Sequence, residues 1–340
     1  MKLKVCHLID DANYGGINRG LDHVARDAGL LAISICEVIR LKRGQLTPPH
    51  IQADVIVSHL SICWKNMPLL TALRCFNPRT PIIHVEHSYS ERFVAAYVPN
   101  KDRFDTLMRA AFSLFDTIVA VSEDQANWMV RRRYVAADEV WTIPSCASLS
   151  SFRDVAPRVA GPTLVVGAVG RMHLQKGFDI LIRGFRKTVR TDMELHLYGD
   201  GPQLDELKAL AGDDPRIIFK GYTPDTASAM AACDVVAMPS RWEPYGIVAV
   251  EAMAARRAIA CSNADGLAGH IRVGAIGISD NTSTGWAQWL ATVSHGDLLE
   301  GEQARFDYGS RAEQRFSDAW VRLLSLSSGR HEAMPLQRAA

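Results

Sequence analysis

The stretch PSRWEPYGIVAVEAMA, residues 239–254, follows an apolar run over residues 233–238 that is typical of a buried strand. A turn is predicted at Glu243 and Pro244, because proline fixes its own φ and restricts the residue before it. The apolar run that begins after Gly246 predicts a buried helix. A strand, a loop and a helix in this order indicate an α/β fold with a parallel sheet.

The predicted loop offers the groups that would hold a phosphate and polyol hydroxyls. Free backbone N–H groups at a helix start bind anions, and we expect those of Ile247 and Val248 to lie there, beside Gly246. Glu243 at the loop and Glu251 inside the helix are acceptors for hydroxyls, with Glu251 suited to a ribose. The alternative is one acid on the helix dipole and one ordinary helix residue. An unpaired carboxylate in the apolar VAVEAMAA is costly, however, so the pattern favours a nucleotide sugar.

The pattern PS-x-x-E-P-Y-G-x-x-x-x-E-A-M-A resembles the signature of the retaining glycosyltransferases of family 4, in which seven residues separate two glutamates. The resemblance implies the GT-B fold, an α/β fold in which two Rossmann-like, doubly wound domains face a central cleft and a C-terminal helix crosses back. We expect residues 1–155, with a helix at about 311–328, to form the acceptor-side domain, and residues 156–310 to bind the nucleotide sugar. The implied reaction moves a sugar from a nucleoside diphosphate to a hydroxyl with retention at the anomeric carbon.

Length and composition agree with a soluble two-domain protein. The chain has 340 residues, of which 48% are hydrophobic, and this length suits two domains. Its net charge of +1 gives no indication that it binds nucleic acid. Seven cysteines are scattered without a C-x-x-C pair, which argues for a reducing compartment and against a zinc site. The sequence contains neither a signal peptide nor an apolar stretch of about 20 residues that would cross a bilayer. We therefore expect a cytoplasmic location.

The second half supplies the cations that the resemblance requires. GRMHLQKG, residues 170–177, places Arg171 after a predicted strand and Lys176 five positions later. Two cations at a helix start can neutralise a diphosphate leaving group as its charge grows. No Asp-x-Asp pair is placed to hold a metal there, so we expect a metal-independent enzyme without a cofactor other than its nucleotide-sugar co-substrate. The turn that contains Tyr222 is, by the resemblance, a candidate contact for the nucleobase.

The first half carries the remaining candidates. Gly15 and Gly16 follow a predicted strand at residues 3–9, where glycines permit a positive φ and expose amides to donor phosphates or acceptor; a plain strand-to-helix turn is the alternative. The family carries a histidine at a strand end that faces the donor sugar, and His87, followed by Ser88, matches it. Ser122 is expected to be a structural N-cap.

Two basic clusters lie in the acceptor-side half, one of Arg131, Arg132 and Arg133, the other of Lys101, Arg103 and Arg109. Such clusters are usually solvated faces, and the alternative is peripheral contact with an anionic membrane or a lipid-linked acceptor. Small members of the family build cell-envelope polysaccharides on such acceptors, with UDP- or GDP-sugars as donors. A glycan or lipid-linked acceptor is therefore expected.

The sequence departs from the family pattern in two loops. Residues 145–148, SCAS, replace the usual Asn-Gly-Val-Asp, and Gly269 stands where an acid is common. These departures leave open a degenerate GT-B domain that binds nucleotide or a partner without catalysis. A nucleotide-sugar epimerase or a phosphorylase is a further alternative of the same fold, although no pyridoxal-phosphate lysine can be assigned.

Overall fold

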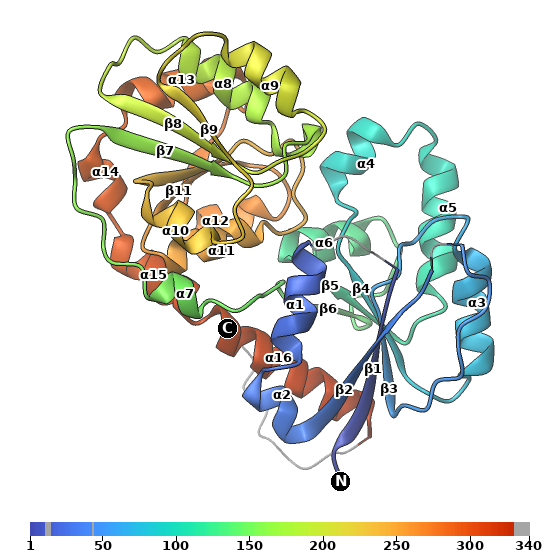
Figure 1. Ribbon diagram of the computed structural model, residues 1–340. Helices are drawn as coiled ribbons and strands as arrows, with labels where there is room; N and C mark the ends of the chain where they lie inside the picture. Colours follow the sequence, from blue (N-terminus) through green and yellow to red (C-terminus); the bar gives the residue numbers. More distant parts are fainter. Residues whose placement is uncertain (11–14, 43, 330–340) are drawn as a thin grey trace.

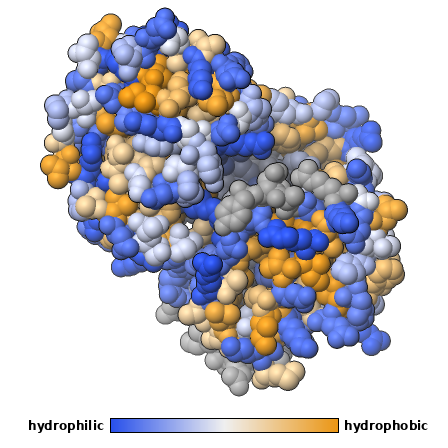
Figure 2. Space-filling model, viewed as in Figure 1, coloured by the Kyte–Doolittle hydropathy of each residue, from blue (hydrophilic) through white to orange (hydrophobic). Residues whose placement is uncertain are grey.

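The computed structural model describes residues 1–10, 15–42 and 44–329, and it contains two six-stranded sheets, each wholly parallel. Figure 1 shows each sheet in its own lobe, with helices on both faces. Figure 2 shows polar and apolar side chains interspersed over both lobes and a recess between them. The expected pair of doubly wound, Rossmann-like units is confirmed.

The first sheet has the strand order β2-β1-β3-β4-β5-β6. Its strands are β1 (Leu3–Ile9), β2 (Ser34–Arg40), β3 (Val55–Ser58), β4 (Ile82–Glu86), β5 (Thr117–Ala120) and β6 (Val140–Thr142). Its helices are α1 (Gly16–Val24), α2 (Ala28–Ile33), α3 (Met67–Phe76), α4 (Glu91–Tyr97), α5 (Lys101–Phe112) and α6 (Glu123–Arg131). The expected cap holds, because Ser122 Oγ accepts a hydrogen bond from Gln125 N at 3.2 Å at the start of α6.

The second sheet has the order β12-β11-β10-β7-β8-β9. Its strands are β7 (Leu164–Val169), β8 (Met193–Tyr198), β9 (Ile217–Gly221), β10 (Val235–Met238), β11 (Ala258–Ser262) and β12 (Ile276–Ile278). Its helices are a 3-10 turn at Leu174–Lys176, α8 (Phe178–Arg186), α9 (Leu204–Ala211), α10 (Thr226–Ala231), α11 (Ile247–Ala254), α12 (Leu267–Arg272), α13 (Ser283–Thr292), α14 (His295–Leu299) and α15 (Glu302–Ser310).

Both sheets place their switch points where the candidate residues lie. From β7 the chain continues to β8 on one side of the sheet, and from the neighbouring β10 it continues to β11 on the other side, so the connections after β7 and β10 leave in opposite directions. In the first sheet the same reversal falls between β1 and β3. Ligands of doubly wound sheets bind beyond the strand ends at such points. The loops after β7, β10, β1 and β3 are therefore the places to look for a site.

The C-terminal helix α16 (Ala312–Ser327) returns to the first lobe, as expected. It packs on α2, and Ser317 Oγ donates a hydrogen bond of 2.6 Å to Asp27 Oδ1. Figure 1 shows it running along the first sheet, next to α1 and α2. The short helix α7 (Ser150–Arg153) lies on the connection between the lobes, and one apolar core extends from β1 through Phe152 to α11. We propose residues 155 and 156 as the domain boundary.

Within the described residues, no helix is both long enough and apolar enough to span a membrane.

Candidate functional site

The loop between β10 and α11 has the conformation that its sequence predicts. Gly246 adopts a φ of +89°, and a Cβ at this position would lie 2.6 Å from Leu267 Cδ2, so glycine is required. The helix begins directly afterwards, with half-buried Ile247 and Val248 in its first turn. Their amides lie among the N–H groups that have no partner inside a helix. This end of α11 is therefore suited to a phosphate.

Lys176 and Glu243 meet at the mouth of this loop, with Lys176 Nζ 2.5 Å from Glu243 Oε2. Two features bring the β7 and β10 loops together. Arg241 N donates to Gln175 O at 2.8 Å, and Gly177 has a φ of +67° in a place where a Cβ would collide with the carbonyl oxygen of Pro239. From the sequence, Lys176 was expected at the diphosphate and Glu243 at the hydroxyls of the donor. In the structure the two side chains form one ion pair at the β7–β10 switch point.

Arg171 is exposed at the end of β7, on the same loop as Lys176. Its charge is felt by His173, whose pKa is lowered first by burial and then by Arg171 and Lys176. The loop therefore carries two cations, Arg171 and Lys176, at the end of β7.

Glu251 has a partner that the sequence did not suggest. Arg19, on α1 of the first lobe, donates from its guanidinium to Glu251 Oε1. Glu251 is fully buried, and within the described part of the chain its other oxygen, Oε2, has no hydrogen-bond partner. Burial raises the pKa of this carboxyl, while Arg19 and, more weakly, Lys176 oppose the rise. A buried acceptor oxygen without a donor is a place for a ligand hydroxyl.

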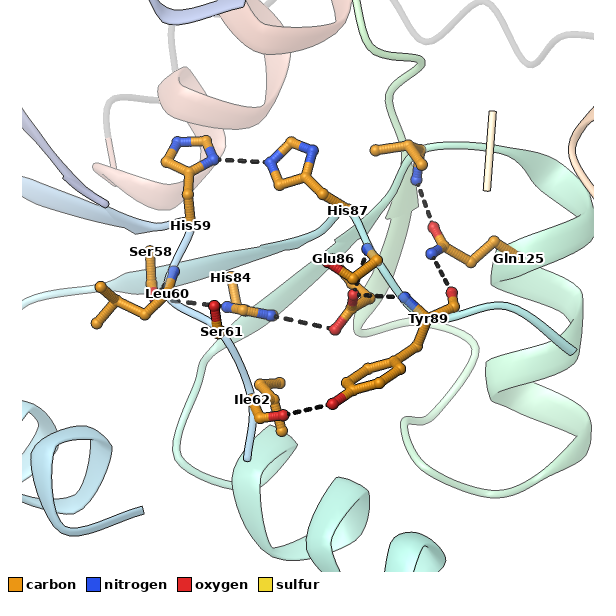
Figure 3. A network of polar contacts seen from close by, with 12 residues as sticks. Ser58, His59, Leu60, Ser61, Ile62, His84, Glu86, His87, Tyr89 and Gln125 are labelled. Carbon is orange, nitrogen blue, oxygen red and sulfur yellow. Dashed lines mark hydrogen bonds and ion pairs between the residues drawn. The ribbon is translucent and has the colours of Figure 1, made fainter. Parts of the chain in front are cut away.

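His87 lies just beyond β4 and is bonded to another histidine. Its Nε2 is 2.9 Å from Nδ1 of His59, which follows β3, and the rings stack with centroids 5.2 Å apart (Figure 3). The preceding residue, Glu86, turns the other way and accepts hydrogen bonds from the amides of Ser88 and Tyr89 at 2.7 and 2.9 Å (Figure 3). Glu86 thus shapes the loop that presents His87.

The glycine pair and the tyrosine are placed differently from the other candidates. Gly15 caps α1 with a φ of −128°, and neither it nor Gly16 has a positive φ, so the positive φ that glycine permits is not used here. A Cβ on either would meet no atom within 4 Å. Residues 11–14 of the same expected loop lie outside the described residues.

Tyr222 is 72% exposed after the edge strand β9, which β8 separates from β7.

Asp265 and Trp242 are two further residues at the cleft that sequence reasoning missed. Asp265, at a φ of +47°, accepts a 3.2 Å hydrogen bond from Glu243 N and also bonds Ser90 Oγ and Arg92 N across the lobes, at 2.8 and 3.0 Å. Trp242 packs between the lobes, against Tyr97 at 4.6 Å. Trp242 directly precedes the signature residue Glu243 in the sequence, and this position was the signal that could have identified it. Asp265 carried no such signal, because it is 22 residues away in sequence.

The two departures from the family pattern lie beneath α1 and within α12. Cys146 and Ala147 are buried beneath α1, where a Cβ on Gly20 would lie 3.2 Å from the Cys146 carbonyl oxygen. Gly269 lies in α12 close to Arg272, which forms an ion pair of 2.9 Å with Asp124 of the first lobe.

No group of three or more histidine, cysteine or acidic side chains is placed to hold a metal ion in the part of the chain that the structure describes. Metal independence stays a prediction.

Comparisons with known proteins agree with this geometry. Residues 30–150 match the model described as Glycosyltransferase Family 4, and residues 163–293 match the one described as Glycosyl transferases group 1. The chain is 29% identical over 294 residues to a phosphatidyl-myo-inositol mannosyltransferase of Mycolicibacterium smegmatis, covering 82% of this chain and 72% of that protein. It is 39% identical over 105 residues to an uncharacterised glycosyltransferase of Methanocaldococcus jannaschii, but it spans only 27% of that protein.

Solved structures share the fold. Anabaena Alr3699/HepE, in complex with UDP and glucose, superimposes with a TM-score of 0.72 at 18% identity, over 95% of this chain and 99% of that one. At this identity the likeness shows the GT-B fold alone.

Proposed function

Because the chain belongs to the family 4 glycosyltransferases, which are retaining enzymes with the GT-B fold, we propose that it transfers a sugar from a UDP- or GDP-sugar to a hydroxyl of a glycan or a lipid-linked acceptor. The observation that supports this proposal most is that Lys176, Glu243 and the start of α11 lie together at one switch point, with Glu251 buried behind them. UDP and glucose in the Anabaena relative make a UDP-sugar the first donor to test.

Each group then has one task in the reaction. Lys176, Arg171 and the first amides of α11 hold the diphosphate and stabilise its charge as the bond to the anomeric carbon breaks. Glu243 accepts hydrogen bonds from donor-sugar hydroxyls, and Glu251 Oε2 accepts them from the ribose. The acceptor oxygen attacks from the side of the leaving phosphate, which takes its proton, so the anomeric configuration is retained.

The ion pair of Lys176 and Glu243 gives this scheme a clear requirement. The lysine serves the diphosphate only if its ammonium group turns from the carboxylate, or bonds both at once, when the donor binds. Lys176 has three N–H donors, and one of them is enough for Glu243. We propose that the pair keeps the lysine oriented before the donor arrives.

The test is a panel of UDP- and GDP-sugars, with release of free nucleoside diphosphate as the measurement and a metal chelator present throughout. We expect release with one donor, and a loss of kcat of roughly 10²-fold in Lys176→Ala and in Arg171→Ala, by analogy with the loss of an oxyanion-hole donor. Lys208→Ala changes an exposed lysine on α9 and serves as the control. Normal turnover in either site variant would refute the assignment.

The degenerate binding module remains the second candidate, and the altered loops at residues 145–148 and Gly269 favour it. It predicts calorimetric binding of UDP or GDP without release from any donor sugar. Turnover by the wild-type chain excludes it.

We also propose a location. The named activity of the Mycolicibacterium relative involves phosphatidyl-myo-inositol, which supports a lipid-linked acceptor for this chain. Synthesis of a cell-envelope polysaccharide at the cytoplasmic face of the membrane, with peripheral contact to anionic lipid, fits such an acceptor.

A further inference from the structure

Three histidines form a chain across the ends of three neighbouring strands. His7 lies within β1, His59 follows β3 and His87 follows β4, and these strands are adjacent in the order β1-β3-β4. His7 Nδ1 is 3.0 Å from His59 Nε2, and His59 Nδ1 is 2.9 Å from His87 Nε2. The rings stack in sequence, with centroid distances of 5.3 and 5.2 Å. Figure 3 shows two of the three histidines, His59 and His87, above the strand ends.

The chain lies where a ligand would meet the first lobe. A small cavity beneath the start of α1 is lined by all three histidines, by Gly16 and by Ser145, and its other walls are largely apolar. Gly16 is a candidate ligand contact, and His87 is the family's candidate for the donor sugar. His59 and His7 had no role in the function proposed above.

Proton counting fixes how the three rings behave together. A neutral imidazole has one N–H and one bare nitrogen. If His7 Nδ1 donates to His59, then His59 Nδ1 donates to His87, and His87 Nδ1 keeps its own proton while His7 Nε2 is bare. If the two inner bonds run the other way, His87 Nδ1 is bare and His7 Nε2 is protonated. The two outer nitrogens therefore always differ, and the state of one sets the other.

Burial keeps the three rings neutral, which the counting requires. Desolvation lowers the pKa of His7 to about 4, and it lowers the pKa of His87 to about 4 against an opposing effect of Glu86 and with help from His84. The pKa of His59 lies well below its ordinary value, through burial and then through its neighbours His87, His7 and His84. With one ring charged, the inner bonds could still form, but both outer nitrogens would then be protonated, so the opposite states of the outer nitrogens require three neutral rings.

We propose that His59 and His7 are positioning residues that hold the ring of His87 and couple its tautomer to that of His7, so that His87 Nδ1 meets the ligand as a donor when His7 Nε2 is bare and as an acceptor when His7 Nε2 is protonated. This inference rests on the proposed function for the identity of the ligand, a donor-sugar hydroxyl. A hydroxyl can both donate and accept, so a fixed Nδ1 selects the direction of that bond. The second ring nitrogen of a functional histidine is commonly what sets its tautomer.

Nitrogen NMR of the histidine rings tests this directly, because it reports which ring nitrogen carries the proton. In the wild-type protein at about pH 7, where rings with these lowered pKa values are neutral, His87 Nδ1 and His7 Nε2 should be in opposite states. Two protonated or two bare outer nitrogens would overturn the proposal without any variant and without any assay of activity.

Kinetics supply the second readout. His59→Phe keeps a flat ring and removes both bonds; we expect mixed tautomers at His87 and a kcat about tenfold lower, the effect of one misdirected hydrogen bond, with the Kd for UDP unchanged. His59→Asn keeps an amide near the Nδ1 position and should recover part of the loss. His196→Phe is the control, a buried histidine of β8 in the second lobe.

The two proposals fail separately. A wild-type protein that turns over no donor defeats the proposed function, while the NMR result still decides the histidine chain. If turnover is normal in His59→Phe, or falls equally in His59→Phe and His196→Phe, the positioning role is wrong and the proposed function stands.

Discussion

Glu251 is fully buried in α11, and Arg19 engages only one of its carboxylate oxygens. Burying such a charge is costly unless it is paired and hydrogen-bonded. The ion pair with Arg19, which joins the two lobes, reduces that cost. The other carboxylate oxygen can still accept a hydrogen bond. A side chain that is half satisfied in the protein alone is suited to bind a hydroxyl, because the ligand completes its hydrogen bonding.

Glu251→Gln tests the ribose contact with little change in shape. The substitution replaces a charged acceptor by a neutral one, so we expect calorimetry to show UDP binding weakened by about tenfold, the usual gap between charged and neutral hydrogen bonds. Glu206→Gln, on an exposed face of α9, is the control. An unaltered Kd in a folded Glu251→Gln protein would remove the ribose role.

The buried histidines predict how stability depends on pH. In the folded chain the pKa values of His7 and His87 are lowered to about 4, from 6.5 when solvated. Between these values the unfolded chain binds protons that the folded chain does not, so the free energy of unfolding must fall as pH falls from about 6.5 towards 4. Urea unfolding of the wild type and of His7→Phe between about pH 7 and about pH 5 measures it. The variant should lose less stability over this range, and an equal loss would contradict the assignment.

At the scale of the element, the β10–α11 unit depends on one left-handed residue. Gly246→Ala places a side chain at a φ of +89° and against Leu267, and we expect it to lower the free energy of unfolding by about 1–3 kcal/mol. Gly161→Ala is the matched control, since its Cβ would meet no atom within 4 Å and its φ is not in the left-handed region. Equal stability of the two variants would show that the α11 start tolerates another conformation.

Local signals explain what was predictable from the sequence. Strand β10 and the start of α11 were found because an apolar run, Pro244 and Gly246 act within a few residues. Strand β11, with the sequence AIACS, was missed because alanine and serine carry little strand preference, and burial between neighbouring strands decides it. The Arg19–Glu251 pair joins residues 232 apart, and no spacing rule reaches so far.

At the scale of the whole molecule, the two lobes are held together around the proposed site. Arg272 pairs with Asp124, Ser90 and Arg92 bond to Asp265, and Phe93 and Tyr97 of α4 pack on Trp242 at 5.5 and 4.6 Å. Together with Arg19 and Glu251, these contacts surround the Lys176–Glu243 pair. Because Asp265 bonds the amide of Glu243 as well as the first lobe, a shift between the lobes would be felt at the signature acid itself.

The basic clusters predicted for a membrane surface are unequal in the folded chain. Arg131 forms an ion pair of 2.7 Å with Glu91, and Arg132 pairs with Asp105, so both charges are partly neutralised. Arg103 instead lies over the ring of Trp64, which is 43% exposed, and Lys101 is exposed beside it in sequence. A tryptophan with neighbouring cations is typical of a protein surface at a lipid headgroup layer.

Trp64, Lys101 and Arg103 are therefore the surface on which we expect anionic lipid to act. Each basic residue near an anionic membrane contributes about 1 kcal/mol, and reversal of two of them should weaken binding to anionic vesicles at low salt by at least about tenfold. The double variant Lys101→Glu/Arg103→Glu should lose flotation with such vesicles, while Arg131→Glu/Arg132→Glu should lose less because its charges are already paired. If the wild-type chain does not float with anionic vesicles at low salt, the peripheral membrane contact is wrong and a soluble acceptor is favoured.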